Sequence, residues 1–417
     1  MSSLVKVGTE VAARRPHKFK AQNSTYSLSE QVVVEMRIAT ESIDFENTRA
    51  MFKVTFGAST DARMVRQFAS QLIKTLRVKT LSGTTIGNDS SEYRAAQQMY
   101  REFLSTNEKD VSWLSVMEGA DGPNLADAGS TIQFAHKIDD HLFALKEYYP
   151  AHLHTGFQVE FDLADAINEV TAELANTGDA LPASISVTDF YIVADLVRLK
   201  PKTALQILEL QKQELLFVDY IQNKVVKNQM NNNTNNDYDI TGIDGRVRAA
   251  FSFMIAAGDR DDDWEPYFGL MRRHNLQSYR FQLGDRYINY AQIPLGTNQK
   301  AEQIFELSKA LDNHTMDRMV GNSTLTPTVL GGEGAINSTT AAADSDRRRF
   351  VVGVKLTRDQ QDVDLTLSSM KDINRNMLRV ELEHSAVPGG TGTIYTVIPV
   401  DKRIRISSSG VIERAQS

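Results

Sequence analysis

Two histidines, His152 and His154, have the spacing that places both side chains on one face of a β-strand. A neutral imidazole is a common zinc ligand, but a zinc site needs further protein ligands to complete it. No third ligand stands near this pair in the sequence. We therefore interpret the two histidines as a surface pair, keep a metal site as the alternative, and expect no cofactor.

Three aspartates, Asp259, Asp261 and Asp263, alternate as the first ligands of a calcium-binding loop do. Such a loop needs glycine at its sixth position and a bidentate glutamate at its twelfth. The sixth residue here is Trp264 and the twelfth is Leu270. The calcium pattern therefore fails, and we expect a solvated acidic loop.

Sequence signatures of catalysis are missing from the chain. Glycine-rich segments occur at residues 331–334 and 389–392, but without the strand-to-helix context that dinucleotide binding requires. The sequence contains no P-loop, no His-Glu-x-x-His motif and no Gly-x-Ser-x-Gly motif. It also contains no cysteine, which excludes thiolate nucleophiles and disulfide bonds. These features favour a protein that is not an enzyme.

The composition is that of a folded protein long enough for two domains. The 417 residues are 41% hydrophobic and 24% charged. The formal net charge is -7, whereas a protein that coats nucleic acid over its whole surface is normally basic. We therefore expect that most of the surface does not bind nucleic acid. No run of about 18 apolar residues occurs, so the sequence predicts no membrane span.

The first 25 residues differ in charge from the rest of the chain. With histidine counted as neutral, their charged residues are one acid, Glu10, and five bases: Lys6, Arg14, Arg15, Lys18 and Lys20. The segment thus carries +4 and the remaining 392 residues carry -11. Its apolar patterning is weak, and it has no apolar segment of signal-peptide length. We predict an N-terminal arm that orders only against a partner and contacts something anionic; a disordered tail is the alternative.

The first half of the chain predicts a β-rich domain with one helix. Alternating or β-branched segments predict strands at residues 32–38, 50–56, 76–81, 157–163 and 185–199. Ser82-Gly83 supplies a turn after the third of these. A helix is predicted next, with a capping-box start at Asp89 and Glu92. Its apolar face is Tyr93, Ala96, Tyr100, Phe103 and Leu104.

A second predicted helix follows Pro201 and covers residues 203–215. Its apolar residues are Leu205, Ile207, Leu208 and Leu215. We interpret this helix as the connector between two domains. The next polar stretch, residues 228–239, contains an Asn-rich run that is too polar to pack, and we predict a surface loop there.

The second half repeats the order of elements found in the first. A strand at residues 278–283 ends at Gly284, and the separation of Leu81 from Ile86 equals that of Leu283 from Ile288. A helix is again predicted next, capped by Thr297 or Asn298. Its apolar face is Ala301, Ile304, Phe305 and Leu311. A repeated plan indicates two copies of one domain type.

The last part of the chain combines a long loop with many short strands. Strands are predicted at residues 350–356, 363–367, 377–382, 394–400 and 403–406, which is typical of a sandwich or barrel. Before them, residues 313–349 are rich in Gly, Ser, Thr and Ala and end in Arg347, Arg348 and Arg349. Loops of this length are usually functional or mobile. We predict that this loop reaches a neighbouring subunit through the three arginines.

The doubled order of strand, turn, helix, long loop and strand resembles one known family. The segments that carry the resemblance are residues 76–83, 154–161, 195–209, 279–284 and 395–406. They resemble the double jelly-roll major capsid proteins of virophages, Polinton-like viruses, adenovirus hexons and their relatives. The resemblance extends from Tyr26 to Ile412 and implies an all-β fold of two tandem jelly-roll sandwiches with short inserted helices.

The same resemblance implies a domain organisation. We expect an arm at residues 1–25, a first jelly roll at 26–200 and a connector helix at 201–214. A second jelly roll would occupy residues 215–412, and residues 413–417 would form a C-terminal tail.

The function implied by the resemblance is that of a major capsid protein. Such a protein trimerises into pseudo-hexagonal capsomers that tile the icosahedral shell of a DNA virus. Its partners would be itself, neighbouring capsomers and penton or minor capsid proteins, with a weak contact of the arm to the genome or an internal membrane. Its location would be the virion, after assembly in the host cytoplasm or nucleus.

Two other functions compete with this one. A carbohydrate-binding or carbohydrate-cleaving β-sandwich would need an aromatic groove and, for cleavage, paired carboxylates. The only tryptophans, Trp113 and Trp264, stand in loop-like segments, which disfavours that alternative. A spike or penton protein usually has one roll, and the doubled plan argues against it.

Overall fold

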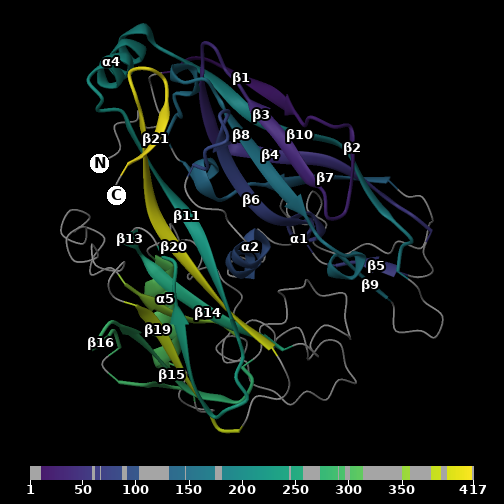
Figure 1. Cartoon of the computed structure of the whole chain (residues 1–417), viewed down its shortest axis with the longest axis vertical. Helices are drawn as coiled ribbons and strands as arrows, with labels where there is room; N and C mark the ends of the chain where they lie inside the picture. The colour runs from purple at the N-terminus through teal and green to yellow at the C-terminus, as the bar shows by residue number, and fades with distance from the viewer. Residues whose placement is uncertain are drawn as a thin grey trace. The chain divides into compact units, whose positions relative to one another are not determined.

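A computed structural model gives the fold of the chain (Figure 1). It describes residues 11–58, 62–65, 67–86, 92–102, 131–145, 147–173, 181–243, 246–256, 273–289, 291–295, 301–312, 350–356, 377–386 and 392–415. These residues belong to two compact units. Unit 1 comprises Met1–Arg94, Trp113–Asn223 and Asp401–Ser417, and unit 2 comprises Ala95–Ser112 and Lys224–Val400.

Unit 1 is built from antiparallel sheets. The larger sheet has the strand order β1-β10-β4-β7: β1 (Val11–Lys20), β10 (Ile185–Leu199), β4 (Ser42–Phe56) and β7 (Thr131–Lys137), with β2 (Thr25–Ser27) also paired to β10. A second sheet has the order β3-β8-β6: β3 (Gln31–Met36), β8 (Phe157–Leu163) and β6 (Ile73–Thr80). A small third sheet pairs β5 (Ala62–Met64) with β9 (Thr171–Glu173). Strands distant in sequence are thus neighbours, as in Greek-key sandwiches.

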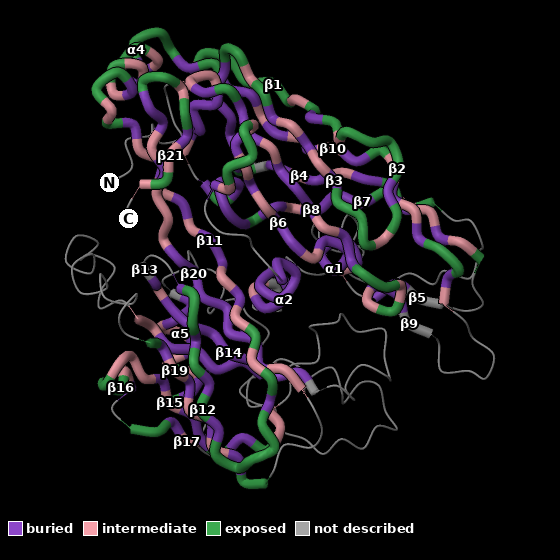
Figure 2. The backbone as a smooth tube through the Cα atoms, viewed as in Figure 1, coloured by how far each residue is buried: buried purple, intermediate pink, exposed green. Residues whose placement is uncertain are grey.

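The core of unit 1 lies between the β1-β10-β4-β7 sheet and the β3-β8-β6 sheet. Phe190 of β10 stacks on Phe52 of β4, and its ring centroid lies 5.3 Å from that of Phe161 in β8. All three side chains are buried, and burying one such ring contributes about 2–3 kcal/mol. The alternation in β3 and β8 explains this packing, because every second residue of these strands is buried (Figure 2).

Short helices complete unit 1. They are α1 (Phe68–Leu72), α4 (Pro201–Lys212) and the 3-10 helices η2 (His141–Ala144), η3 (Ala151–Leu153) and η4 (Ile167–Glu169). Proline at the first helical position is favourable because its missing N–H has no helical acceptor, and α4 starts at Pro201. The chain returns to unit 1 at its end, where β20 (Gly392–Ile406) finishes and forms a hairpin with β21 (Ile412–Ala415).

Unit 2 contains two larger sheets. One has the order β11-β20-β14-β18: β11 (Phe217–Gln229), β20, β14 (Ala249–Ala256) and β18 (Val352–Lys355), with β13 (Arg246–Val247) also paired to β20. The other has the order β12-β19-β15-β16: β12 (Asn235–Ile240), β19 (Leu378–His384), β15 (Leu276–Leu283) and β16 (Arg286–Tyr287), with β17 (Ile293–Pro294) paired to β15. The residues of both sheets, among them Tyr279, Phe281 and Ile398, form one buried cluster.

A second apolar cluster in unit 2 joins helices to strands. Leu307 and Ala310 of α5 (Ala301–Asp312) pack with Phe251 of β14, as do the unit 2 residues of α2 (Tyr93–Glu102). Gly353 of β18 permits this approach: a Cβ added there would lie 2.9 Å from Leu307 Cδ1 and 3.0 Å from Phe251 Cδ1. The helix can therefore lie close to the sheet only because position 353 has no side chain.

The repeated plan expected from the sequence is present in the strand order. The orders β3-β8-β6 and β12-β19-β15 correspond strand by strand, as do β1-β10-β4-β7 and β11-β20-β14-β18. After each of β6 and β15 the chain folds back on the strand: Ile86 N donates to Val78 O at 2.7 Å, and Ile288 N donates to Phe281 O at 3.0 Å, with one residue fewer between donor and acceptor. A helix follows each turn, α2 in one case and α5 in the other. The predicted all-β class with inserted helices is confirmed.

Several predicted boundaries were wrong. Residues 235–240 lie in strand β12 and not in a surface loop, because Asn236, Tyr238 and Ile240 point inward while the polar residues between them face out. The strands predicted at 394–400 and 403–406 are one continuous strand, β20. Helix α2 begins at Tyr93, and Glu92 has a positive φ of 57°, so Glu92 precedes the helix and does not lie in its first turn; Asp89 lies outside the described residues.

Helix faces were also predicted imperfectly. In α4 the buried residues are Thr203, Ile207 and Gln211, whereas Leu205 is 59% exposed. In α5 Phe305 is 59% exposed, and Leu307 and Ala310 are buried instead. The predicted strand at 363–367 and the caps Thr297 and Asn298 lie outside the described residues. The predicted domain ranges 26–200 and 215–412 stay a prediction.

Candidate assembly surfaces

The outward face of the β3-β8-β6 sheet carries a tightly paired row of charges. Glu160 of β8 lies between two cations of β6, with Oε2 3.5 Å from Arg77 Nη1 and 2.8 Å from Lys79 Nζ. Gln31 and Gln158 donate to the same carboxylate at 3.2 and 2.7 Å. The Glu160 side chain is only 4% exposed, although it points away from the core. Four donors thus hold one carboxylate rigidly on a sheet face.

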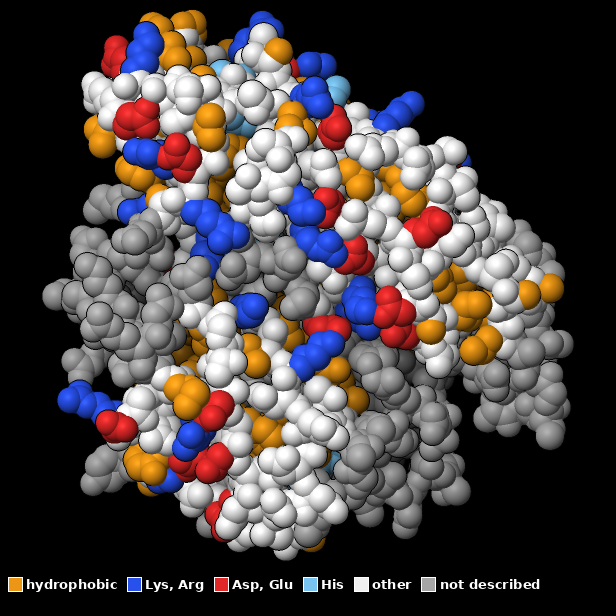
Figure 3. Space-filling view, viewed as in Figure 1, with side chains coloured by type: hydrophobic (Ala, Val, Ile, Leu, Met, Phe, Trp, Pro, Cys, Tyr) orange, Lys and Arg blue, Asp and Glu red, His pale blue; other side chains and the backbone are white. Residues whose placement is uncertain are grey.

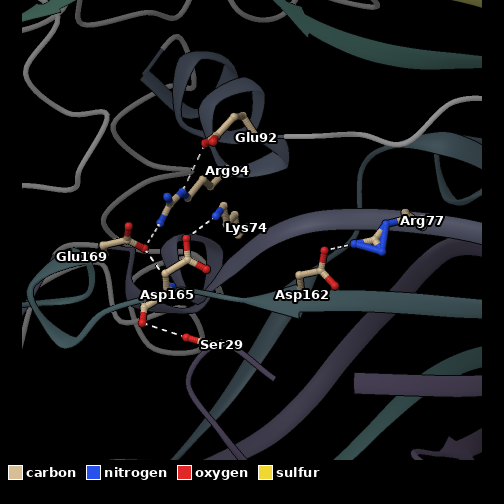
Figure 4. A network of polar contacts seen from close by, with 8 residues as sticks. All are labelled: Ser29, Lys74, Arg77, Glu92, Arg94, Asp162, Asp165 and Glu169. Carbon is tan, nitrogen blue, oxygen red and sulfur yellow. Dashed lines mark hydrogen bonds and ion pairs between the residues drawn. The ribbon is translucent and has the colours of Figure 1, made fainter. Parts of the chain in front are cut away.

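A second network surrounds the start of α2 (Figure 4). Arg94 is 2% exposed; its Nη1 donates to Glu169 Oε2 at 2.8 Å, and its Nε lies 3.6 Å from Glu92 Oε2. Glu169 Oε2 also accepts from the backbone N of Asp165 at 3.1 Å, and Asp165 forms an ion pair with Lys74 of β6. A buried guanidinium requires such compensation, so the network stabilises Arg94 within unit 1.

Part of the predicted N-terminal arm belongs to the β1-β10-β4-β7 sheet, which corrects the expectation that the arm orders only against a partner. Residues 11–20 are not an unstructured arm, because they form β1 and pair with β10 from Leu199 to Tyr191. Phe19 is the one buried residue of β1, and its side chain packs in the core of unit 1. The rest of β1 is mostly exposed and forms the edge of its sheet (Figure 2).

Two of the five predicted arm bases are ion-paired inside unit 1. Arg14 pairs with Asp44 and Asp195, and Arg15 Nη2 lies 2.7 Å from Glu41 Oε2. The hydrogen bond from Arg15 lowers the pKa of Glu41. Lys18 and Lys20, by contrast, are exposed. The Nζ atom of Lys18 lies 4.7 Å from the ring centroid of Tyr191.

The outward face of the β12-β19-β15 sheet in unit 2 has a comparable charge row. Arg280 Nε donates to Glu381 Oε2 at 2.9 Å, and the guanidinium lies 3.4 Å from the ring centroid of Tyr287. Arg379 pairs with Asp239 at 2.7 Å. Arg280 opposes Glu381 across β15 and β19 in the way that Arg77 opposes Glu160 across β6 and β8.

Surface charge of both signs is distributed over the described residues (Figure 3). Lys and Arg side chains lie beside Asp and Glu side chains over much of the visible face, with scattered hydrophobic residues between them. Exposed ion pairs of this kind each contribute about 0–1 kcal/mol, so they affect recognition more than stability.

The two histidines do not form a surface pair, which is a second correction. His154 is buried against Tyr149 and Phe157, and its Nδ1 accepts a hydrogen bond from Gly156 N at 2.9 Å. Burial lowers the pKa of His154 to about 4. His152 is partly buried in η3, and burial lowers its pKa too. The sequence suggested a strand, but the chain here forms a 3-10 turn.

The C-terminal hairpin is fastened to α4 within unit 1. The buried Gln211 donates from Nε2 to Leu153 O and to Ser407 O, both at 2.8 Å. Glu214 accepts from the backbone N and the Oγ of Ser408 at 3.0 and 2.6 Å. Polar contacts from one helix end therefore hold the returning chain.

Other predicted residues cannot be placed. Lys6, Arg347, Arg348, Arg349, Asp259, Asp261, Asp263, Trp113 and Trp264 lie outside the described residues. Among the residues that the structure describes, no group of three His, Asp or Glu side chains is arranged to hold a metal ion. None of the described helices is long and apolar enough to cross a membrane.

Sequence reasoning missed two sets of paired charges. The charge rows could have been suspected from Arg77 and Lys79 on one strand and Glu160 on another, but their pairing depends on which strands are neighbours. The Arg94 network has no local signal, because Glu169 lies 75 residues away along the chain.

Comparison with known proteins relates the fold to viral shells. No family model matches the sequence, and no curated protein matches it. Solved structures do match. A Faustovirus major capsid protein has a TM-score of 0.63 at 6% identity, covering 98% of this chain and 92% of that one.

Two further structures extend the comparison. The Sputnik virophage structure has a TM-score of 0.59 at 12% identity, covering 98% of this chain and 89% of that one. The PBCV-1 virus capsid has a TM-score of 0.58 at 11% identity, covering 99% of both chains. The chain therefore has the double jelly-roll fold seen in viral major capsid proteins, and the predicted resemblance is confirmed at the level of the fold.

Proposed function

We propose that this chain is a major capsid protein, a structural subunit of a virion and not an enzyme. Three copies would form a pseudo-hexagonal capsomer, and capsomers would tile the icosahedral shell of a DNA virus. The observation that carries this proposal is the similarity of the whole chain to capsid subunits of similar length, with 98–99% of this chain and 89–99% of the other chains covered. These matches cover nearly the whole chain, so its length can be accounted for without a separate catalytic domain.

The repeated plan supports the trimer in particular. Two similar rolls per chain give six similar units in a trimer, which is the number that a hexagonal tile requires. The partners would be other copies of the chain, together with penton or minor capsid proteins. A carbohydrate-binding or carbohydrate-cleaving sandwich is the alternative, but no observation on the described residues favours it.

The segment at residues 313–349, which the sequence predicts to be a long loop, remains our candidate for reaching a neighbouring subunit through Arg347, Arg348 and Arg349. Deleting residues 331–343 should leave the fold intact and weaken the trimer. Circular dichroism would report the fold, and light scattering would report the mass. An unchanged trimer mass would exclude this role for the loop.

An interior contact of the N-terminal segment also remains a proposal, with a changed basis. Arg14 and Arg15 are ion-paired, so a weak contact to the genome or an internal membrane would depend on Lys6, Lys18 and Lys20. Truncation of residues 2–22 is a poor test because it would remove β1 and the buried Phe19. Substituting the three lysines by glutamine tests the contact without removing the strand.

The oligomeric state in solution tests the proposed function. Size-exclusion chromatography with multi-angle light scattering should give three times the chain mass for the purified protein, with larger assemblies at high concentration. A monomer at all concentrations that binds immobilised glycans would instead support the carbohydrate-binding alternative.

A further inference from the structure

The charge row of unit 2 contains two carboxylates that form no ion pair with a described residue. Arg280 pairs with Glu381 and Arg379 with Asp239, whereas Asp237 and Glu383 have no such pair, although Asp237 contributes to the raised pKa of Arg379. Glu383 accepts one hydrogen bond, from Ser278 Oγ at 2.7 Å. The outward face of β12-β19-β15 therefore has four carboxylates against two guanidinium groups.

These two carboxylates are neighbours on the sheet. Asp237 of β12 lies opposite Glu381, and Glu383 is two residues further along the same strand, β19. Both point outward, because Tyr238 and Leu382 beside them are buried. Diagonal neighbours on an antiparallel pair lie about 7–8 Å apart. The face thus presents two negative charges at a fixed spacing.

The matching face of unit 1 lacks this feature. The register places Val33 where unit 2 has Asp237, and Asp162 where unit 2 has Glu383. Asp162 is neutralised by an ion pair with Arg77. The Arg–Glu pair is common to both units, but the unneutralised acidic pair belongs to unit 2 alone.

A complementary pair of cations lies on unit 1. Lys18 and Lys20 of β1 point outward on either side of the buried Phe19, and neither forms an ion pair with a described residue. Residues two apart on a strand are separated by about 7 Å, which matches the spacing of the two carboxylates. Because β1 is an edge strand with exposed side chains, these lysines are accessible to another molecule.

We propose that the outward face of β12-β19-β15 is a docking surface for a second copy of this chain. In that contact Lys18 and Lys20 of one copy pair with Asp237 and Glu383 of the next. Each like-charged pair is repulsive when alone, and docking neutralises both. A contact between two different surfaces is heterologous, so repetition with the right rotation closes a ring. The inference rests on the proposed function and assigns its subunit contact.

Charge reversal tests this contact in the full-length chain. The first variant is Lys18→Glu with Lys20→Glu, and the second is Asp237→Lys with Glu383→Lys. Each should weaken self-association about ten-fold or more at low salt, measured as the association constant by sedimentation equilibrium. Combining all four substitutions should restore association to within a few-fold of the original.

A matched control for the lysine variant is Lys202→Glu with Lys212→Glu on α4. It makes the same change in net charge as that variant, at two exposed positions. It should leave association unchanged. Circular dichroism and thermal unfolding of every variant report folding, and all four reversed side chains are at outward positions. Rescue by the four-fold variant also excludes a folding defect as the cause of the losses.

Three results would overturn the inference. Normal association of both reversed variants would exclude the contact while leaving the proposed function standing. Loss of bound nucleic acid from the lysine variant with normal association would assign the lysines to an interior contact instead. A wild-type chain that stays monomeric at all concentrations would refute the proposed function and this contact with it.

Discussion

At the scale of single residues, the buried charged side chains Arg94 and Glu160 each lie beside groups that compensate their charge. Arg94 is buried but lies between two carboxylates, and Glu160 is buried among four donors. An uncompensated charge at such a place would cost several kcal/mol, so these groups fix geometry through their partners. The sequence alone could not predict them, because the partners are distant along the chain and depend on the strand order.

The Arg94 network should be sensitive to the loss of its cation. Arg94→Met should lower the free energy of unfolding by about 3 kcal/mol, because Glu169 and Glu92 would lose their compensation. Adding Glu92→Gln and Glu169→Gln should recover part of that loss. Urea unfolding followed by fluorescence measures both. Equal stability of the single and triple variants would show that the carboxylates do not depend on Arg94.

The buried His154 should make stability depend on pH. Its folded pKa, about 4, lies below the ordinary value of 6.5, so the unfolded chain binds more protons between those values. The free energy of unfolding should therefore fall as the pH is lowered from 6.5 to 4, by on the order of 3 kcal/mol from this group.

A variant isolates this contribution. His154→Gln keeps an acceptor for Gly156 N but cannot be protonated, so its stability should vary less with pH than that of the wild type. Urea unfolding at pH 7, 6, 5 and 4 gives the two curves. Parallel curves for the two proteins would assign the pH dependence to other groups.

At the scale of elements, the alternation of apolar and polar residues predicted most strands. Two strands, β1 and β12, were missed because most of their residues are polar. The segments at 157–163 and 185–199 were predicted with the bounds of β8 and β10. Strand β12 was missed because its outward residues are Asn and Asp, although Tyr238 and Ile240 mark its inward face. Strand β1 was missed because only Phe19 is buried, and an edge strand needs few apolar residues.

The approach of α5 to β18 depends on Gly353. Gly353→Ala should destabilise unit 2 by about 1–2 kcal/mol, since the new methyl group would press on Leu307 and Phe251. In a double-mutant cycle with Leu307→Ala, the two effects should be less than additive because the shorter side chain makes room. Additive losses in thermal or urea unfolding would show that the methyl group does not meet Leu307.

The hairpin of β20 and β21 should depend on Gln211. Gln211→Leu removes the donor that two carbonyls share, and each loses a hydrogen bond in a buried place. We expect a loss of about 1–3 kcal/mol and faster hydrogen exchange at Ile406 and Ile412. Gln213→Leu is the matched control. Unchanged exchange in the Gln211 variant would show that the hairpin is held by its other contacts.

At the scale of the whole molecule, the doubled plan carries the argument. The resemblance was recognisable from the order of elements, because turns after β6 and β15 and the helices that follow leave local signals. The matching Arg–Glu pairs add a second correspondence that depends on register and was not predictable.

The central claim is that the chain builds a viral shell, and direct imaging of the purified full-length protein tests it. Negative-stain electron microscopy, with a concentration series at low and physiological salt, should show flat pseudo-hexagonal particles of three subunits, and closed shells or sheets of such tiles as concentration rises. Class averages without three-fold symmetry, or discrete single chains at every concentration, would contradict the account.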